Sequence, residues 1–152
     1  MNVLEFLKQD HQEAMNMMQQ IEKANVGGQK AKMDLFNQLK SALTLHTSME
    51  EQIFYPELEN YQETRDLVRE AYSEHQQVKD MLSEISGISA SDEEFLSMIA
   101  ELRESVQHHV REEEDEIFPQ VRQILDQKQL NDMGRRMQEM KQGKTVTATK
   151  RK

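Results

Sequence analysis

Six residues of types that bind metal ions occupy matched positions in this chain of 152 residues: His11, His46, Glu50, His75, His109 and Glu113. His46 and Glu50 are four residues apart, as are His109 and Glu113. Side chains at this spacing lie on one face of an α-helix, about one turn apart. Each pair can therefore point into the interior of a helical protein. There, His11 and His75 can approach the two pairs from other helices.

The surroundings of the two glutamates favour a bound metal. Both lie on otherwise apolar helical stripes, where an unpaired carboxylate has lost its hydration at a cost of several kcal/mol. Two nearby carboxylates also repel each other, so one of them would be expected to take up a proton. Metal cations remove both penalties, and neutral imidazoles complete their coordination.

The number of ligands indicates a dinuclear centre. Four histidines and two glutamates are more ligands than one tetrahedral zinc ion accepts. They suit two metal ions that share Glu50 and Glu113 as bridges, with about two imidazoles on each ion. Iron or manganese fits this mixture of ligands best, and positions remain for a bridging oxygen and an exogenous ligand.

The ligand pattern occurs twice in the sequence. Residues 10–21 match residues 74–85, with His75 following His11 by 64 positions, and residues 46–56 match residues 109–119, with an offset of 63. Two helix–loop–helix halves in nearly the same register would bring the six side chains together around a pseudo-two-fold axis. This repetition separates the set from chance spacing.

Simpler interpretations of the same residues stay open. A lone histidine on an apolar stripe is more often a hydrogen-bonded core residue than a ligand, and a run of acidic residues is usually a solvated face. A bundle whose polar interior is merely hydrogen-bonded is therefore the structural alternative, which failure to bind metal would favour. His108 is predicted to lie on the surface or behind the ligands. Packing is the expected role of Tyr55, Tyr61 and Tyr72, although they could line an access route.

The elements that must position these residues are helices. Apolar residues recur at three- and four-residue steps, which predicts helices over residues 3–25, 29–60 and 63–86, and a fourth from a capping box at residues 91–94 to about Pro119. Gly27-Gly28 should end the first helix, and Pro56 should kink or fray the second. A short fifth helix over residues 129–141 and a disordered basic tail, 143–152, follow. We expect an all-α, up-down-up-down four-helix bundle over residues 1–142.

Composition limits the classes of function. The 28 acidic and 19 basic residues give a formal net charge of −9, so neither nucleic-acid nor membrane-surface binding is expected. The chain has no cysteine, which excludes disulfides, thiolate metal sites and cysteine chemistry. Without a signal-like start or a membrane-spanning run, we expect a cytoplasmic protein.

The order of these motifs resembles the hemerythrin-like, HHE cation-binding family. The matching parts, between Leu4 and about Lys141, are His11, His46-x-x-x-Glu50 with Pro56, Glu74-His75, and His109-x-x-x-Glu113 followed by Glu114 and Ile117-Phe118-Pro119. Ferritin-type di-iron bundles use Glu-x-x-His instead, and none of the five histidines here has glutamate three residues before it. The resemblance implies a four-helix bundle that holds two non-haem iron ions (Fe2+/Fe3+) with an oxo or hydroxo bridge, and makes manganese or zinc a poorer fit.

Two departures distinguish the chain from oxygen-carrying hemerythrins. Those proteins have a further histidine where this chain has Ala71, and aspartate where Glu113 stands, which implies a more symmetric and more open site here. The set of four histidines and two glutamates is similar to that of the repair-of-iron-centres proteins, which act in nitrosative and oxidative stress. Those proteins typically carry an extra N-terminal domain with a cysteine pair, so the resemblance covers their site and not their repair function.

The resemblance implies a protein that binds or reduces a small diatomic or peroxide species such as O2, NO or H2O2, in oxidative or nitrosative stress. Turnover would need an electron donor, which the sequence does not name, so enzymatic activity stays an open question. The alternative is a non-catalytic module for O2 or NO sensing, storage or iron delivery. A sensor would act through a protein partner at the fifth helix and the basic tail.

Overall fold

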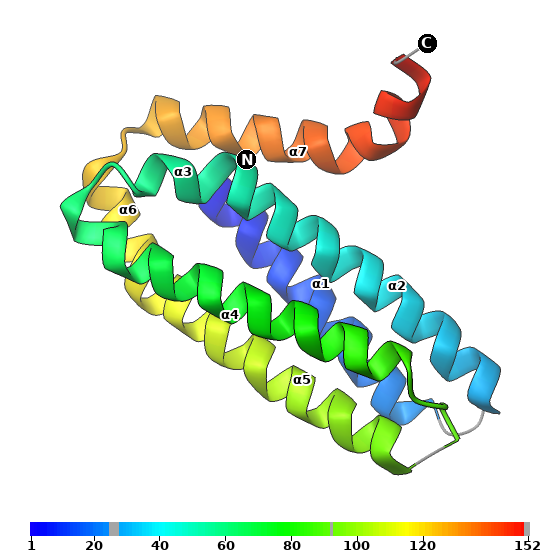
Figure 1. Cartoon of the computed structure of the whole chain (residues 1–152). Helices are drawn as coiled ribbons and strands as arrows, with labels where there is room; N and C mark the ends of the chain where they lie inside the picture. Colours follow the sequence, from blue (N-terminus) through cyan, green and yellow to red (C-terminus); the bar gives the residue numbers. More distant parts are fainter. Residues whose placement is uncertain (25–27, 92, 151–152) are drawn as a thin grey trace.

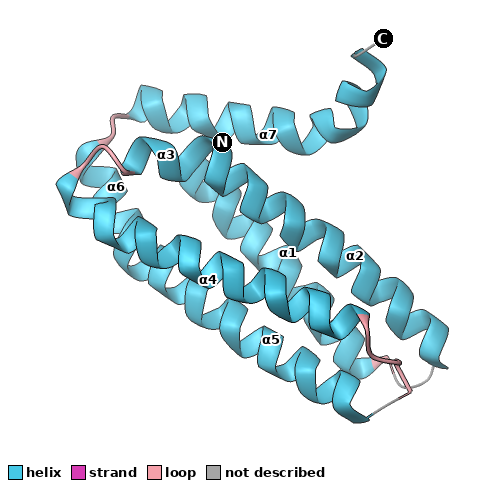
Figure 2. Ribbon diagram, viewed as in Figure 1, coloured by secondary structure: helices cyan, strands magenta, loops and turns pink. Residues whose placement is uncertain are grey.

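Four long helices form an antiparallel bundle (Figures 1 and 2). The computed structural model describes residues 1–24, 28–91 and 93–150, with side chains as far as Gly143. Within that part of the chain there is no strand, and the four rods of the bundle start with α1 (Val3–Lys23), α2 (Gly28–Met49), α4 (Gln62–Ser86) and α5 (Glu93–Glu112). The predicted all-α, up-down-up-down bundle is confirmed.

Local hydrogen bonds explain where α1 begins. The side chain of Asn2 accepts a hydrogen bond from the backbone N–H of Glu5, and the Glu5 side chain accepts one from the N–H of Asn2. This reciprocal pair satisfies N–H groups that have no partner within the helix. The predicted stop at Gly27 and the predicted capping box at residues 91–94 involve residues 25–27 and 92, which lie outside the described residues.

The second and fourth rods each contain a π-helical turn. After α2 the chain forms η1 (Glu50–Phe54) and then α3 (Tyr55–Leu58); after α5 it forms η2 (Glu113–Ile117) and then α6 (Phe118–Ile124). Each π segment closes through a bond from a backbone N–H to the carbonyl of the glutamate five residues earlier. A proline follows each segment, and it cannot donate a backbone hydrogen bond. We expected a kink or fraying at Pro56; the chain does not fray there but continues as α3 after the wider turn.

Helix α7 (Gln127–Lys150) lies across the end of the bundle, close to the N-terminus and to α3 (Figure 1). Its packing on α1 depends on Gly134, because a Cβ at that position would overlap the backbone of Met1 and Asn2. The helix is longer than the expected segment 129–141, since no proline follows to end it. The division of the chain into a bundle of residues 1–142 and a disordered tail stays a prediction.

The apolar core is divided into two clusters. One includes Phe54 and Phe118 near α7, and the other includes Phe36 and Phe95 toward the opposite end of the bundle. Along each rod, the ligand-type residues fall at the border between the two clusters. They therefore form a polar layer that is enclosed by apolar side chains on both sides.

Candidate metal centre

The six residues selected from the sequence all turn inward and meet in the polar layer between the two clusters. Glu50 and Glu113 are fully buried, and none of the four histidines exceeds 6% exposure. Their side-chain atoms form two overlapping groups, in each of which the potential ligand atoms lie within 4.8 Å of one another. The first group is His11, His46, Glu50 and Glu113, and the second is Glu50, His75 and His109.

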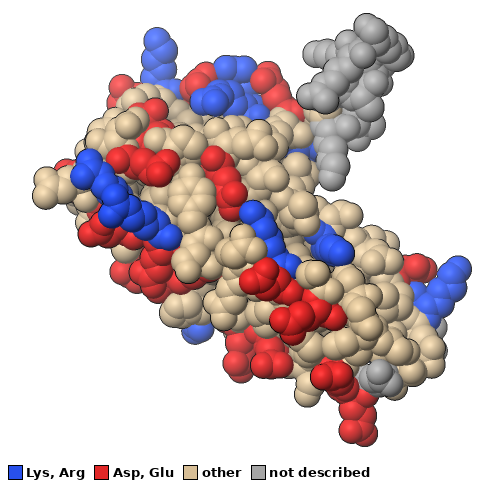
Figure 3. Space-filling model, viewed as in Figure 1, with Lys and Arg blue, Asp and Glu red and all other residues tan. Residues whose placement is uncertain are grey.

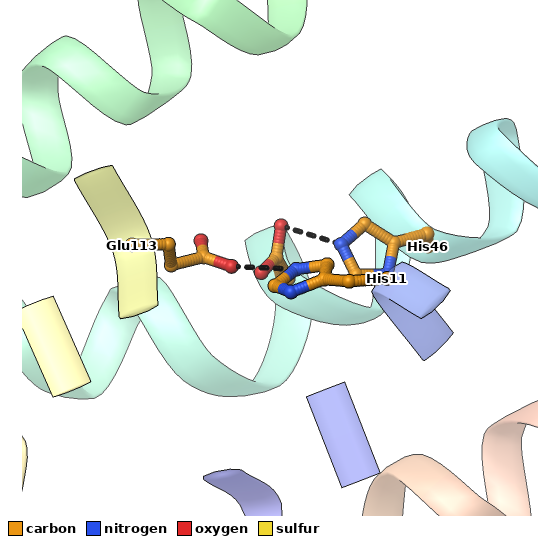
Figure 4. A group of neighbouring side chains, drawn as sticks. His11, His46 and Glu113 are labelled. Atoms are coloured by element: carbon orange, nitrogen blue, oxygen red, sulfur yellow. Dashed lines mark ion pairs between the residues drawn. The ribbon is translucent and has the colours of Figure 1, made fainter. Parts of the chain in front are cut away.

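The inner nitrogen of each ring faces a carboxylate. His11 Nε2 lies 3.0 Å from Glu113 Oε1, and His75 Nε2 lies 2.9 Å from Glu50 Oε1. His46 Nε2 lies 3.2 Å from the same oxygen of Glu50. Figure 4 shows Glu113 and the two rings of His11 and His46 pointing toward one another from different helices. These nitrogen–oxygen distances suit side chains that surround a common centre.

Four inner atoms of the site lack hydrogen-bond partners. They are His11 Nε2, His46 Nε2, Glu50 Oε2 and Glu113 Oε1. Although His11 Nε2 and Glu113 Oε1 are close, their orientation does not make a hydrogen bond. A buried polar atom without a partner costs about 1–3 kcal/mol, and more when the group is charged. Imidazole nitrogens and carboxylate oxygens are ligands that iron accepts. The residues therefore fit a pair of metal ions, which would be the partners that these atoms lack.

The outer nitrogens of the rings are held by a second set of carboxylates. The Nδ1 atoms form four contacts: His11 with Glu114 at 2.8 Å, His46 with Asp10 at 2.5 Å, His75 with Glu51 at 2.7 Å, and His109 with Glu74 at 2.6 Å. A carboxylate that accepts from Nδ1–H orients the ring and leaves the Nε2 lone pair free for a metal.

Sequence reasoning did not assign a role to these four acidic residues. Each one is adjacent in sequence to one of the six, and the arrangement repeats with the two halves of the chain. The sequence could have indicated these four residues through its repeated neighbours, which are Asp10-His11 with Glu74-His75 and Glu50-Glu51 with Glu113-Glu114. The partners themselves could not be predicted, because each carboxylate binds a histidine on another rod.

Without metal, the electrostatics of the site raise the pKa of three of its histidines, His11, His46 and His109. Burial alone lowers the pKa of His46, but the nearby carboxylates of Glu50 and Asp10 outweigh it and raise this pKa to about 10. Burial likewise opposes the charge on His109, yet Glu113 and Glu50 raise its pKa well above the usual range. For Glu50, the histidines overcome the effect of burial and lower the pKa. In the metal-free protein, imidazolium groups therefore neutralise the buried carboxylates.

Tyr55 reaches the centre, which differs from the packing role expected for it. Its ring is fully buried, and its hydroxyl donates to Glu113 and lies 3.1 Å from Glu50 Oε1. The Tyr55 hydroxyl oxygen also lies 3.2 Å from His75 Nε2. The corresponding position in the second half of the chain is Phe118, which stacks beside His11 with the ring centroids 6.4 Å apart. The repeated halves therefore build a centre that carries a hydroxyl on one side only.

The other residues singled out lie outside the ligand layer. The side chain of His108 is 61% exposed, and its Nε2 lies 3.1 Å from Glu112 Oε1, in keeping with its predicted surface position. Tyr72 packs against the ring of Tyr55 with centroids 5.3 Å apart. Tyr61 is partly buried against the core. None of the three contributes an atom to the two ligand groups.

A small cavity adjoins the histidines. It has a volume of about 20 Å³, enough for a water-sized molecule. All four histidines of the centre line it, and most of the remaining wall is aliphatic: Ala14, Leu43, Val78, Val106 and Val110. Space beside the centre is therefore limited to a very small molecule and is mostly apolar.

Comparison with known proteins identifies the family. Residues 2–121 match the sequence model of the Hemerythrin HHE cation binding domain. The chain belongs to this family. A solved hemerythrin HHE cation-binding domain-containing protein from Mycobacterium kansasii superimposes with a TM-score of 0.83 at 25% sequence identity, over 100% of this chain and 94% of that one.

Two curated relatives are longer than this hemerythrin-like chain. A DNA nickase of Nostoc sp. is 30% identical over 129 residues, which is 85% of this chain and 36% of that protein. An uncharacterised hemerythrin-like protein of Schizosaccharomyces pombe is 30% identical over 122 residues, or 79% of this chain and 59% of that one. The chain thus spans only part of each relative.

The surface agrees with the acidic composition. Acidic side chains spread over the face shown in Figure 3 with basic ones among them, so the described residues of this face form no continuous basic surface. Among the helices that the structure describes, none combines the length and apolar character needed to cross a bilayer. The absence of nucleic-acid partners and the cytoplasmic location stay predictions.

Proposed function

We propose that this hemerythrin-like chain holds two non-haem iron ions at His11, His46, Glu50, His75, His109 and Glu113, and that it binds or reduces a small species such as O2, NO or H2O2. The observation that carries the proposal is the set of buried nitrogen and oxygen atoms that converge without hydrogen-bond partners. Leaving these atoms unpaired would cost several kcal/mol, which bound metal removes.

The protein's own residues would have distinct tasks. Glu50 belongs to both ligand groups and Glu113 contacts histidines of both, so these two carboxylates are suited to bridging. The outer carboxylates would hold the rings in position. Two bound iron ions would supply redox-active centres with open positions for a small ligand. The surrounding apolar clusters exclude water from the layer.

The size of the cavity supports a small ligand. A space of about 20 Å³ beside the histidines has room for a molecule about the size of water, which favours a ligand as small as a diatomic species or a peroxide. Its aliphatic wall offers few hydrogen-bond partners. We therefore propose a role in handling reactive or diatomic oxygen and nitrogen species, as in oxidative or nitrosative stress.

Metal analysis tests the proposal. The chain would be purified without added metal, reconstituted anaerobically with ferrous iron, and assayed for bound iron, zinc and manganese with its absorption spectrum before and after oxidation. About two irons per chain and new near-ultraviolet and visible absorption on oxidation are expected. One zinc, or no metal after reconstitution, would contradict a di-iron centre.

A matched pair of histidine variants locates the metal. His75→Ala should lower bound iron, whereas His108→Ala should leave it unchanged because His108 is mostly exposed.

Titrations of the iron-loaded protein with O2, NO and H2O2 then separate two outcomes. Repeated consumption of ligand in the presence of a reductant indicates an enzyme, and saturable binding without consumption indicates a sensor, a store or an iron-delivery module.

A further inference from the structure

The four outer carboxylates of the centre do not have equivalent surroundings. Asp10 and Glu74 occupy matching positions in the two halves of the chain and hold His46 and His109, respectively. Their second carboxylate oxygens meet different groups. Asp10 faces a lysine from α7, whereas Glu74 faces histidine and glutamate side chains of α5.

Lys141 is closely bound to Asp10. Its Nζ lies 2.8 Å from Asp10 Oδ1, while Asp10 Oδ2 lies 2.5 Å from His46 Nδ1. The carboxylate is 10% exposed and the lysine 37% exposed, so the contact lies at the edge of the buried layer with its acidic partner inside. The ammonium also lies 5.6 Å from the centre of the Phe6 ring and 3.3 Å from Glu13 Oε1. A continuous chain of contacts thus runs from α7 to a metal-facing ring.

The matching carboxylate lacks such a cation. Among the residues that the structure describes, no lysine or arginine forms an ion pair with Glu74. Its free oxygen lies 3.5 Å from Nε2 of the exposed His108. The carboxylate behind His109 is therefore less compensated by positive charge than the carboxylate behind His46.

The remaining two carboxylates do not reproduce the contact with Lys141. Glu51 holds His75, and Lys79 lies 3.4 Å from it, which is longer than the 2.8 Å contact of Lys141, and Glu51 is 25% exposed where Asp10 is 10% exposed. Glu114 holds His11 and is 27% exposed. The pair of Asp10 and Lys141 is thus the shorter of the two lysine contacts and has the more buried carboxylate.

Chemistry links this difference to the metals. A carboxylate that accepts from imidazole N–H makes the ring a stronger donor to a metal. A cation on the same carboxylate weakens that effect and adds a positive field. We propose that Lys141 is a positioning residue that acts through Asp10 and makes the two iron ions inequivalent, raising the reduction potential at His11 and His46 above that at His75 and His109. The inference rests on the proposed di-iron function.

Mediated potentiometric titration of the iron-loaded protein tests the inference, together with the ferrous Mössbauer spectrum. The wild type should show two midpoint potentials and two ferrous environments. Lys141→Met should lower the higher potential and leave the lower one, whereas Lys141→Arg should retain the wild-type values. Lys128→Met removes the same charge from the exposed face of α7 and should change neither potential.

A second comparison separates a contact with Asp10 from a general effect on the fold. In an Asp10→Asn background, Lys141→Met should no longer shift the potential, while circular dichroism reports whether the helices persist. Two bound irons with the same potentials in the wild type and Lys141→Met would overturn this inference alone. Fewer than two irons in the wild type would overturn the proposed function, and this inference with it.

Discussion

Glu50 and Glu113 have the most demanding environment of any residues in the bundle. Both are fully buried, and each retains one oxygen without a hydrogen-bond partner. The metal-free chain compensates their charge with protonated histidines rather than with lysine or arginine. These histidines can release their protons, so the same side chains can exchange protons for metal ions.

Removal of one bridging carboxylate should reduce metal content. In Glu113→Ala, the two oxygens that face His11 and His109 are lost, so we expect no more than about one iron per chain after ferrous reconstitution. Glu116→Ala is the matched control, since this exposed residue lies in the same π segment. Iron content that is equal in both variants and the wild type would favour a bundle whose polar interior is only hydrogen-bonded.

The hydroxyl of Tyr55 should stabilise the metal-free protein. Tyr55→Phe removes a buried hydrogen bond to a charged carboxylate, which is worth about 1.5–3 kcal/mol of unfolding free energy. Urea unfolding of the metal-free chain measures this loss. Tyr72→Phe provides the comparison, because the ring of Tyr72 packs against Tyr55 at the edge of the layer. Equal losses in both variants would contradict the assigned contact.

At the scale of helices, the π turns and the ligands coincide. Each π segment begins at a buried, inward-facing glutamate and is followed by a proline-containing turn. Single π turns inside α-helices occur frequently at functional sites. The wider turn changes the register of the rod, which allows His46 and Glu50 to face the centre while Tyr55 reaches it from one turn further along.

The close contact between α7 and the start of α1 can be tested at Gly134. An alanine in an open helix stabilises by about 1 kcal/mol relative to glycine. At Gly134, however, its Cβ would overlap the backbone of Met1 and Asn2, so we expect a net loss of roughly 1–3 kcal/mol in urea unfolding. Gly87→Ala is the control, since its Cβ would lie 3.5 Å from the nearest atom, Glu84 O. A more stable Gly134→Ala protein would show that α7 does not pack as described.

For the molecule as a whole, two similar halves enclose one shared centre. The ligand layer divides the apolar core, and each half contributes three of the six inner residues. Metal binding is therefore linked to the packing of all four rods. Because a ligand that binds only the folded state stabilises it, removal of metal should loosen the entire bundle rather than one helix.

The affinity for metal should depend on pH. Nearby carboxylates raise the pKa of His46 to about 10 and that of His109 well above its usual range, so both rings are protonated near pH 7 without metal. Metal must displace these protons, and the apparent affinity should fall about tenfold per pH unit for each proton released. Competition titrations with a chelator between about pH 6 and 8 measure the slope. His108→Ala should leave this slope unchanged. An apparent metal affinity that does not vary with pH would contradict the displacement of protons by metal.

Proton binding also affects the stability of the metal-free chain. A histidine whose pKa is raised on folding stabilises the folded state most fully below its unfolded value of 6.5. This stabilisation decreases as the pH rises and is lost above about 10. The metal-loaded protein should not show this loss, because metal then replaces the proton.

Local patterns in the chain were sufficient to predict the helices and the six inner residues. Apolar periodicity reports which face of a helix is buried, and a spacing of four places His46 and Glu50 on that face without reference to the rest of the fold. The repeat then predicted that the halves would combine. The nature of the metal followed from the types of ligand and stays a prediction.

Contacts between distant segments were decided only by the folded chain. Glu114 binds His11, 103 residues away in sequence, and Lys141 binds Asp10 across 131 residues. The hydroxyl of Tyr55 meets Glu113 from another rod. No periodicity encodes such pairs, because they depend on the rotation and depth of one helix against another. The six inner residues therefore follow from local pattern, whereas their orientation and their unequal surroundings follow from packing.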